Sequence, residues 1–412
     1  MNETLRRHAE TAARDAIRAV MPRDGVRRAL TGMTFPGRVF LVAVGKAAPA
    51  MAAAAVDVLP RSVTEGVVIS KYGHFTAPLA GLRCIEAGHP VPDENSVLAA
   101  DAALALTADL REDDTVLLLL SGGGSALWEK PLVPLSELQD ITRQLLSSGA
   151  DIGEVNTIRK RLSGVKGGRF ARRCAPARVE AVALSDVLGD RLDKIASGPV
   201  SPDSATCADA LAIVERYHLR LSAEAERCLR VETPKEITNV HAQVVGSVRE
   251  LCRAAGEACR RLGYAPVLLT DRLEGEAREA GRQLAAILRA HAGEGKKLAF
   301  LAGGETVVHV TGDGLGGRNQ ELALAAAEGL RGLHGAALIS VGSDGTDGPT
   351  DAAGGYVDGD TWEALAEKGV SLEDVWRNND AYHALQAVEG LIITGPTGTN
   401  VNDVCIGLID GK

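Results

Sequence analysis

Residues 115–127 read TVLLLLSGGGSAL, an apolar run followed at once by three glycines between two serines. A short, uninterrupted apolar run of this kind is typical of a strand buried on both faces of a parallel sheet. Three glycines let bare backbone N–H groups approach an anion closely, and the hydroxyls of Ser121 and Ser125 can donate to it. A plain tight turn is the alternative, but a turn rarely needs three glycines. The stretch therefore predicts a buried strand ending in a phosphate-binding turn.

The same alternation of strands and helices extends in both directions along the chain. Apolar runs predict buried strands at 39–44, 66–70, 115–120, 179–184, 240–245, 266–270 and 298–302, and periodic patterns predict helices at 5–20, 50–59, 248–262 and 276–291. Such alternation indicates βαβ units and parallel sheets. Residues 306–311 are expected to form a hairpin with 298–302 across Gly303-Gly304-Glu305.

The length of 412 residues exceeds what one ordinary core organises and suits two domains. The sequence VETPKE at 231–236 separates a helical stretch from a new strand. We therefore predict an α/β protein with two domains, residues 1–233 and 234–412.

Composition and charge exclude several classes of function. The formal net charge is −9, whereas nucleic-acid-binding proteins usually carry a basic face. Seven scattered cysteines form no C-x-x-C pair, as expected of reduced thiols. Residues 1–20 are too charged for a secretory signal, and the apolar run 116–120 is too short to cross a bilayer. We expect a cytoplasmic protein without nucleic-acid or membrane partners.

Ligands of open α/β sheets bind beyond the carboxyl ends of the strands. Gly45-Lys46 follows the strand 39–44 and precedes a helix, so helix N–H groups and an ammonium would favour phosphate there. A solvated lysine after a turn is the alternative. Asp186 and Asp190 follow the strand 179–184. Carboxylates beside a phosphate loop are the usual anchors for Mg²⁺, although aspartates also cap helices.

The densest polar region lies in the second half of the chain, where GDGLGGRNQE spans 312–321 and GSDGTDGPTD spans 342–351. Arg318 is expected to open a helix beside free N–H groups, which would make an oxyanion receiver with Gly316 and Gly317. Asp344 and Asp347 could hold a metal or accept a proton. The alternative is an acidic surface loop, which the density of glycine disfavours.

Gly312, Gly314 and Gly317 also fit G-x-G-x-x-G, the fingerprint of dinucleotide-binding dehydrogenases. Two observations weaken that interpretation: the preceding strand is assigned to a hairpin, and the parallel alternation begins elsewhere. There is no Walker A sequence either. The basic stretch 156–169 could bind an anion or form a solvated helix face, and its turn Lys166-Gly-Gly-Arg169 favours anion binding.

A set of nine motifs resembles the two-domain glycerate 2-kinases in the same order along nearly the whole chain. They are VGKAA (44–48), GHPVPD (88–93), LSGGGSAL (120–127), IRKRLSGVKGGR (158–169), LSDVLGD (184–190), IASGP (195–199), GGRNQELAL (316–324), DGTDGPTDAAG (344–354) and GPTGTNVND (395–403). The segment 207–236 carries none of the resemblance. Val200 and Ser343 replace the threonines usual in the family.

The resemblance implies a Rossmann-like N-terminal domain, a second α/β domain of the MOFRL type and an active site in the cleft between them. It implies the phosphorylation of D-glycerate to 2-phosphoglycerate with ATP and Mg²⁺ or Mn²⁺. By position in the motifs, Lys46 and Arg318 are the suspected catalytic cations. A homodimer is compatible with the sequence. The alternatives are an NAD(P)H-dependent hydroxypyruvate reductase and a non-catalytic nucleotide or sugar-acid sensor.

The predicted site combines residues of both halves. The predicted catalytic residues are Lys46, Arg318, Asp344 and Asp347; the nucleotide or phosphate contacts are Gly45, Ser121, Gly122, Gly123, Gly124, Ser125, Lys166, Gly316 and Gly317; the substrate contacts are Arg159 and Asn319; and the metal ligands are Asp186 and Asp190. Phosphoryl transfer depends mainly on positioning and on neutralisation of charge, which this set of cations, glycines and carboxylates can provide.

Overall fold

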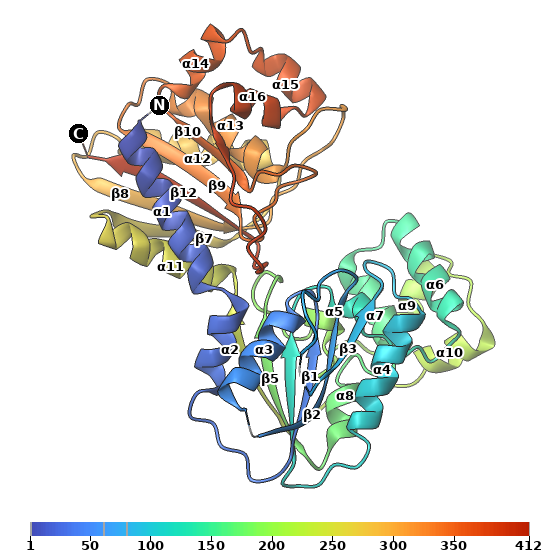
Figure 1. Cartoon of the computed structure of the whole chain (residues 1–412). Coiled ribbons are helices and arrows are strands. Elements are labelled where there is room, and N and C mark those ends of the chain that lie inside the picture. Colours follow the sequence, from blue (N-terminus) through green and yellow to red (C-terminus); the bar gives the residue numbers. More distant parts are fainter. Residues whose placement is uncertain (1, 61, 80, 412) are drawn as a thin grey trace. The chain divides into compact units, whose positions relative to one another are not determined.

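Two neighbouring strands, β1 (Val39–Val44) and β4 (Thr115–Leu120), form the centre of a six-stranded sheet in the computed structural model, which describes residues 2–60, 62–79 and 81–411 (Figure 1). Every residue of both strands is buried, as the apolar runs predict. The strand order is β3-β2-β1-β4-β5-β6, and the pairings among β1 to β5 are parallel. The carboxyl ends of five strands therefore meet at one edge.

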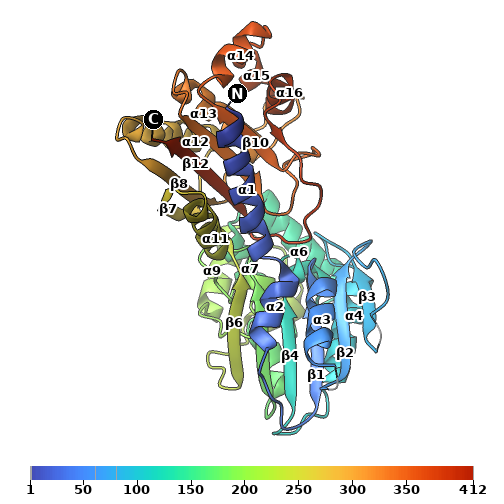
Figure 2. The same ribbon diagram turned by 60° about the vertical axis from the view of Figure 1, so that its left-hand side comes forward.

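This sheet belongs to the compact unit Pro22–Val245. Its other elements are α2 (Pro22–Leu30), α3 (Ala48–Val58), β2 (Val63–Lys71), β3 (Arg83–Ala87), α4 (Glu94–Leu106), α5 (Gly124–Leu127), α6 (Leu135–Ser147), α7 (Ile152–Arg161), α8 (Arg169–Cys174), β5 (Arg178–Leu184), the 3₁₀ helix η1 (Ile195–Ser197), α9 (Cys207–Arg216), α10 (Ala223–Leu229) and β6 (Val240–Gly246). Helices α2 and α3 cover one face of the sheet, as Figure 2 shows. Helices α6, α7, α9 and α10 build a satellite core that includes the segment outside the motifs.

The second unit consists of Met1–Met21 and Gly246–Lys412. Its elements are α1 (Glu3–Ala19), α11 (Val248–Arg261), β7 (Ala265–Leu273), α12 (Ala277–His291), β8 (Lys297–Gly304), α13 (Arg318–Leu330), β9 (Ala336–Gly342), β10 (Gly354–Asp358), α14 (Thr361–Glu367), α15 (Leu372–Asn378), α16 (Ala381–Ala387), β11 (Leu391–Ile392) and β12 (Asp403–Asp410). The sheet order is β11-β10-β9-β12-β8-β7, and it is mixed because β12 runs antiparallel to both β8 and β9. Helices α1 and α11 pack on it together, and α12 and α13 share a further core with its strands.

The structure divides the chain differently from the predicted segments 1–233 and 234–412. The first helix, α1, packs on β9 and β12 of the second unit, strands that lie far from it in sequence (Figure 1). Strand β6 extends the sheet of the first unit, and Ile237, Val240 and Val244 pack against that core. The sequence shows where an element begins but not which sheet receives it.

The predicted hairpin at 298–311 is wrong. Strand β8 pairs with β7 on one side and with β12 on the other, so both of its edges are already occupied. Val307 forms only an isolated bridge, with Glu276. In the part of the chain that the structure describes, no helix is both long and apolar enough to traverse a bilayer.

The division of the chain predicts how fragments behave. A fragment of residues 22–245 is expected to melt cooperatively, and the shorter fragment 22–233 to melt at a lower temperature. The shorter fragment loses β6 and the apolar contacts of residues 237–244 with the core. Circular dichroism melts of both fragments test this. Equal melting temperatures would show that β6 does not stabilise the unit.

Candidate active site

The first cluster of the candidate site is the junction where β1 and β4 end side by side. The backbone N–H of Ser121 donates to Val44 O at 2.9 Å, and that of Lys46 donates to Gly122 O at 2.9 Å. The Ala47 N–H donates to the Ser121 hydroxyl at 3.1 Å. Gly45 has φ +125°, and a Cβ at this position would overlap Ser121. The glycine therefore lets the two turns touch, and the predicted Gly45 and Ser121 lie together.

The three glycines of the turn 122–124 are needed for close approach. A Cβ on Gly122 would clash with Asp186 Oδ2. Gly123 has φ +88°, and a Cβ there would lie 3.2 Å from His89 Cδ2 and 3.3 Å from Lys46 Cγ. The turn is thus surrounded by the side chains of Lys46, His89 and Asp186, which come from the carboxyl ends of three strands.

The ammonium of Lys46 is the available cation of this cluster. Its side chain is half-buried, and no residue in the described ranges forms an ion pair or hydrogen bond with its Nζ. Its backbone is fixed by contrast, because the N–H donates to Gly122 O and the carbonyl lies 3.2 Å from His74 Nδ1. A fixed backbone with an uncommitted charge suits binding of an anion.

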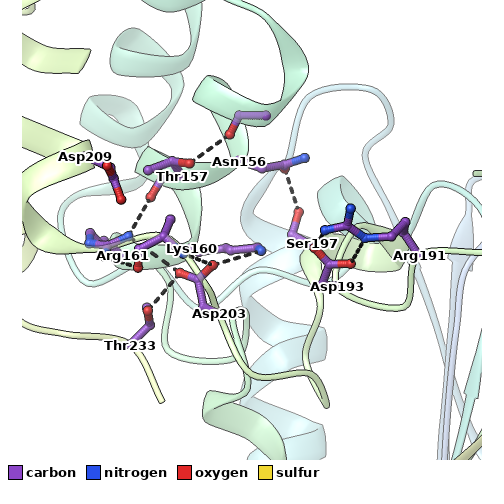
Figure 3. Close-up of polar contacts among 12 residues, drawn as sticks. Asn156, Thr157, Lys160, Arg161, Arg191, Asp193, Ser197, Asp203, Asp209 and Thr233 are labelled. Atoms are coloured by element: carbon purple, nitrogen blue, oxygen red, sulfur yellow. Dashed lines mark hydrogen bonds and ion pairs between the residues drawn. The ribbon is translucent and has the colours of Figure 1, made fainter. Parts of the chain in front are cut away.

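Ser125 belongs to a polar chain that also reaches Arg159. The hydroxyls of Ser125 and Ser197 lie 2.8 Å apart, and the Ser197 hydroxyl donates to Asn156 Oδ1 at 3.0 Å (Figure 3). Arg159 Nη2 donates to Ser125 O at 2.9 Å, while its Nε is buried without a partner in the described chain. Burial lowers the pKa of Arg159. Arg159 thus places a buried, incompletely paired guanidinium beside the turn, and its role in binding a carboxylate stays a prediction.

Strain accompanies this polar chain. Ala196 and Ser197 have φ +50° and +59°, values that cost a residue with a side chain about 1 kcal/mol or more. A Cβ added to Gly124 would lie 2.8 Å from the Ala196 Cβ, so Gly124 and the strained segment pack against each other.

Three further cations of the basic stretch are paired inside the core, whereas Arg169 keeps its Nε and Nη2 buried without a partner among the described residues. Lys160 and Arg161 are buried and pair with Asp203, at 3.1 Å and 3.5 Å, and Thr233 Oγ1 donates to the same carboxylate at 2.7 Å (Figure 3). Lys166 is 1% exposed and donates to Glu129 at 2.6 Å. Burial lowers the pKa of Lys166 to about 8. The prediction that Lys166 binds phosphate is therefore corrected, because its charge is neutralised inside the core.

The predicted metal ligands follow β5. Asp190 has φ +54°, and its Oδ1 is buried with no hydrogen-bond partner among the described residues. Asp186 lies against Gly122 in the glycine-rich turn. No group of three or more His, Cys, Asp or Glu residues in the described ranges could hold a metal. Two carboxylates nevertheless fit Mg²⁺, which takes one or two of them together with substrate phosphates and water.

The second cluster centres on Arg318, at the first residue of α13. Its guanidinium donates to both Asp403 oxygens, at 2.6 Å and 3.0 Å, and to Glu305 Oε1 at 2.8 Å. Burial opposes the charged form of Arg318, but the hydrogen bonds and charge of Asp403 outweigh it and raise the pKa. Burial raises the pKa of Asp403 despite this pairing. The guanidinium is rigidly aimed, and two of its five N–H groups remain for another ligand.

The helix N–H groups expected to be free beside Arg318 are occupied. Asp347 accepts hydrogen bonds from the N–H groups of Asn319 at 3.1 Å and Gln320 at 2.8 Å. It is 3% exposed, and burial raises its pKa to about 6. Asn319 is also buried, and its Oδ1 accepts from the Ser340 hydroxyl at 2.6 Å. Both residues hold the start of α13, and the catalytic role of Asp347 and the substrate contact of Asn319 stay predictions.

The glycines of 312–317 serve packing as well. Cβ atoms on Gly312 and Gly314 would collide with Asn378, and one on Gly317 would collide with Asp347. A Cβ on Gly316 would lie 3.3 Å from Asn379 O. The phosphate contacts of Gly316 and Gly317 stay a prediction, but this packing already gives both glycines a structural role. Although the hairpin argument against a dinucleotide site fails, this packing provides a stronger one, because the chain's own loop fills the space.

Asp344, the other predicted catalytic carboxylate, lies near Asp403, the ion-pair partner of Arg318. Its Oδ1 accepts from the Thr346 N–H at 3.0 Å. A Cβ on Gly342 would lie 3.2 Å from Asp344 Oδ1 and 3.5 Å from Asp403 Oδ1, so the two carboxylates flank this glycine. The sequence reasoning missed Asp403, Glu305 and His89. Two of these residues could have been found from the motifs. Asp403 is the only acidic residue of the motif 395–403, and His89 is the only histidine of the motif 88–93.

Fold and site together define a two-unit α/β enzyme of the phosphoryl-transfer class, with a glycine-rich turn and an uncommitted lysine at the carboxyl edge of a parallel sheet. Residues 8–230 match the family described as "Domain of unknown function (DUF4147)", and residues 298–403 match the MOFRL family. The chain belongs to the family that combines these two domains, similar members of which are named as glycerate kinases.

Individual relatives agree with the assignment. A D-glycerate 2-kinase of Thermotoga maritima is 51% identical over 99% of both chains. A protein of Agrobacterium vitis with the provisional name hydroxypyruvate reductase is 40% identical, over 89% of this chain and 86% of that protein. A crystal structure of a glycerate kinase (EC 2.7.1.31) from Thermotoga maritima superposes with a TM-score of 0.96 at 50% identity, covering 99% of this chain and 100% of that one.

The pairing pattern predicts that the two cations differ in their effect on stability. Arg318→Ala leaves the buried Asp403 without its partner and is expected to cost roughly 3 kcal/mol. Lys46→Ala removes no ion pair and should leave stability unchanged. Urea unfolding curves of both variants test the contrast. An Arg318→Ala protein as stable as the wild type would refute the structural importance of the pair.

Proposed function

We propose that the protein phosphorylates D-glycerate with ATP. The observation that carries the proposal is the Lys46 side chain, which flanks the glycine turn 122–124 at the carboxyl edge of the sheet and whose ammonium has no partner among the described residues. Bare backbone and a cation are what a transferring phosphoryl group needs. The names of the similar kinases support glycerate as the acceptor. The packed glycines at 312–317 favour this function over the reductase alternative.

Each cluster contributes a distinct task. Lys46 neutralises charge that develops on the phosphoryl oxygens, and the remaining N–H groups of Arg318 donate to an oxyanion. Arg159, held by Ser125 O, binds the carboxylate of glycerate. Asp344 is the remaining carboxylate of the two predicted bases, since Asp347 is committed to α13, and it orients the acceptor.

A divalent cation fits the proposal. Asp190, with its unpartnered oxygen, and Asp186 would hold Mg²⁺ or Mn²⁺. When bound, the ion supplies charge neutralisation to the ATP phosphates. All seven cysteines are free thiols, which supports the proposal of a cytoplasmic enzyme. A homodimer stays a prediction.

Loss of Lys46 should reduce catalysis without loss of fold. Lys46→Ala is expected to lower kcat about a hundred- to a thousandfold, the usual cost of a lost transition-state contact. ADP release with D-glycerate as acceptor measures it, and exposed Lys368→Ala serves as the matched control. Normal turnover of the Lys46→Ala variant would contradict the proposal and would show that Lys46 is a solvated turn residue without a catalytic role.

The acceptor oxygen is proposed to be the C2 hydroxyl, as in the 2-kinase relative. The kinase structure from the same organism carries the EC number of the 3-kinase, so the product must be measured. Because a misplacement of about 1 Å can cost a hundredfold in rate, one oxygen should dominate. Coupling through enolase alone should give a signal, and a signal that needs added phosphoglycerate mutase would identify C3.

The metal requirement is measured separately, because enolase itself needs Mg²⁺. ADP release, followed directly by chromatography, should stop in excess EDTA, and ADP release in EDTA would exclude the metal.

A further inference from the structure

The motif at 88–93 contributes a histidine to the glycine-rich turn. Strand β3 ends at Ala87, two places from β1 in the sheet order, yet His89 reaches the turn that follows β4. A Cβ on Gly123 would lie 3.2 Å from His89 Cδ2 and 3.4 Å from its Nε2. The loop after β3 thus carries the imidazole across the ends of β2 and β1 to the Lys46 side chain, which flanks the same glycine.

The imidazole has no task within the fold. It is half-buried, and no described residue forms a hydrogen bond or ion pair with either ring nitrogen. Asp344, the other candidate base, accepts the Thr346 N–H through Oδ1, and the variants below distinguish it from His89. A general base needs a lone pair that is free and close to the transferring group.

We infer that His89 is the general base for the acceptor hydroxyl, an inference that rests on the proposed kinase function. The O–H bond of glycerate breaks and its proton passes to an imidazole nitrogen. The same oxygen forms a bond to the γ-phosphorus while the bond from that phosphorus to the bridging oxygen breaks and ADP leaves. His89 then returns the proton to solvent, so charge and atoms balance.

The surroundings of His89 keep the imidazole in its proton-accepting form. Burial lowers the pKa of His89, and the charges of Lys46, Lys71 and His74, which face it from the ends of β1 and β2, lower it further. Its pKa therefore lies below the ordinary 6.5, and the imidazole is neutral at pH 7. The rate should fall only when the pH drops through that lowered pKa.

The test is the pH dependence of kcat/KM for D-glycerate, measured by ADP release between pH 5 and 9. The wild type should lose activity on the acid side with an apparent pKa below 6.5. His89→Gln should lower the rate about a hundred- to ten-thousandfold and abolish that acid limb. The exposed His334→Gln, in the other compact unit, should keep both the rate and the limb, and Asp344→Asn should keep the limb whatever its rate.

Two further measurements remove any dependence on a single variant. Added imidazole should restore turnover to His89→Ala, which a purely structural role would not allow. The NMR titration of His89 in the unaltered protein should give the pKa of the kinetic limb. The inference is overturned by an acid limb that survives in His89→Gln, by absent rescue, or by a mismatch of the two pKa values. No ADP release by the wild type at any pH would overturn the proposed function itself.

Discussion

The contact between the ends of β1 and β4 is the constraint on which the candidate site depends. Two backbone hydrogen bonds, from Ser121 to Val44 O and from Lys46 to Gly122 O, lock the two turns in register. The buried apolar runs supply the parallel pairing, because β1 and β4 align residue for residue from Val39 and Thr115. Packing of the core thereby determines where the lysine and the glycine turn meet. The remaining polar groups are added to this frame by loops after the other strands.

In the second unit, the main constraint is the start of helix α13. The N-terminus of α13 has unpaired N–H groups that must be satisfied, and the buried Asp347 satisfies two of them. Arg318 is in turn held by Asp403, which begins β12. These contacts explain why aspartates and glycines are dense in this region without each of them touching a ligand. Together these contacts hold the guanidinium of Arg318 in a fixed orientation.

Much of the fold could be predicted from local patterns in the sequence. The strands at 39–44 and 115–120 have the predicted bounds because an apolar run with a glycine stop is a local signal. Pairing is not local: β12 lies about a hundred residues beyond β8, so the sequence around Gly303-Gly304 suggested a hairpin instead. The placement of α1 with the second unit is equally invisible along the chain. In the candidate site, the positions of Lys46 and of the turn 121–125 could be predicted, because both follow an apolar strand and include glycine. The commitment of Lys166 to Glu129 and of Asp347 to α13 was not, because ion pairing depends on tertiary neighbours.

The central claim is that the β1–β4 junction forms the phosphoryl-binding site, and the kcat/KM of Gly45→Ala tests it most directly. A Cβ at 45 would overlap Ser121 and force the two turns apart. The matched control is Gly149→Ala, because Gly149 also has positive φ, +77°, but has no atom within 4 Å of an added Cβ. The account predicts that Gly45→Ala loses at least about a hundredfold in kcat/KM while Gly149→Ala keeps it. A folded Gly45→Ala protein that phosphorylates glycerate as well as the control would contradict the account.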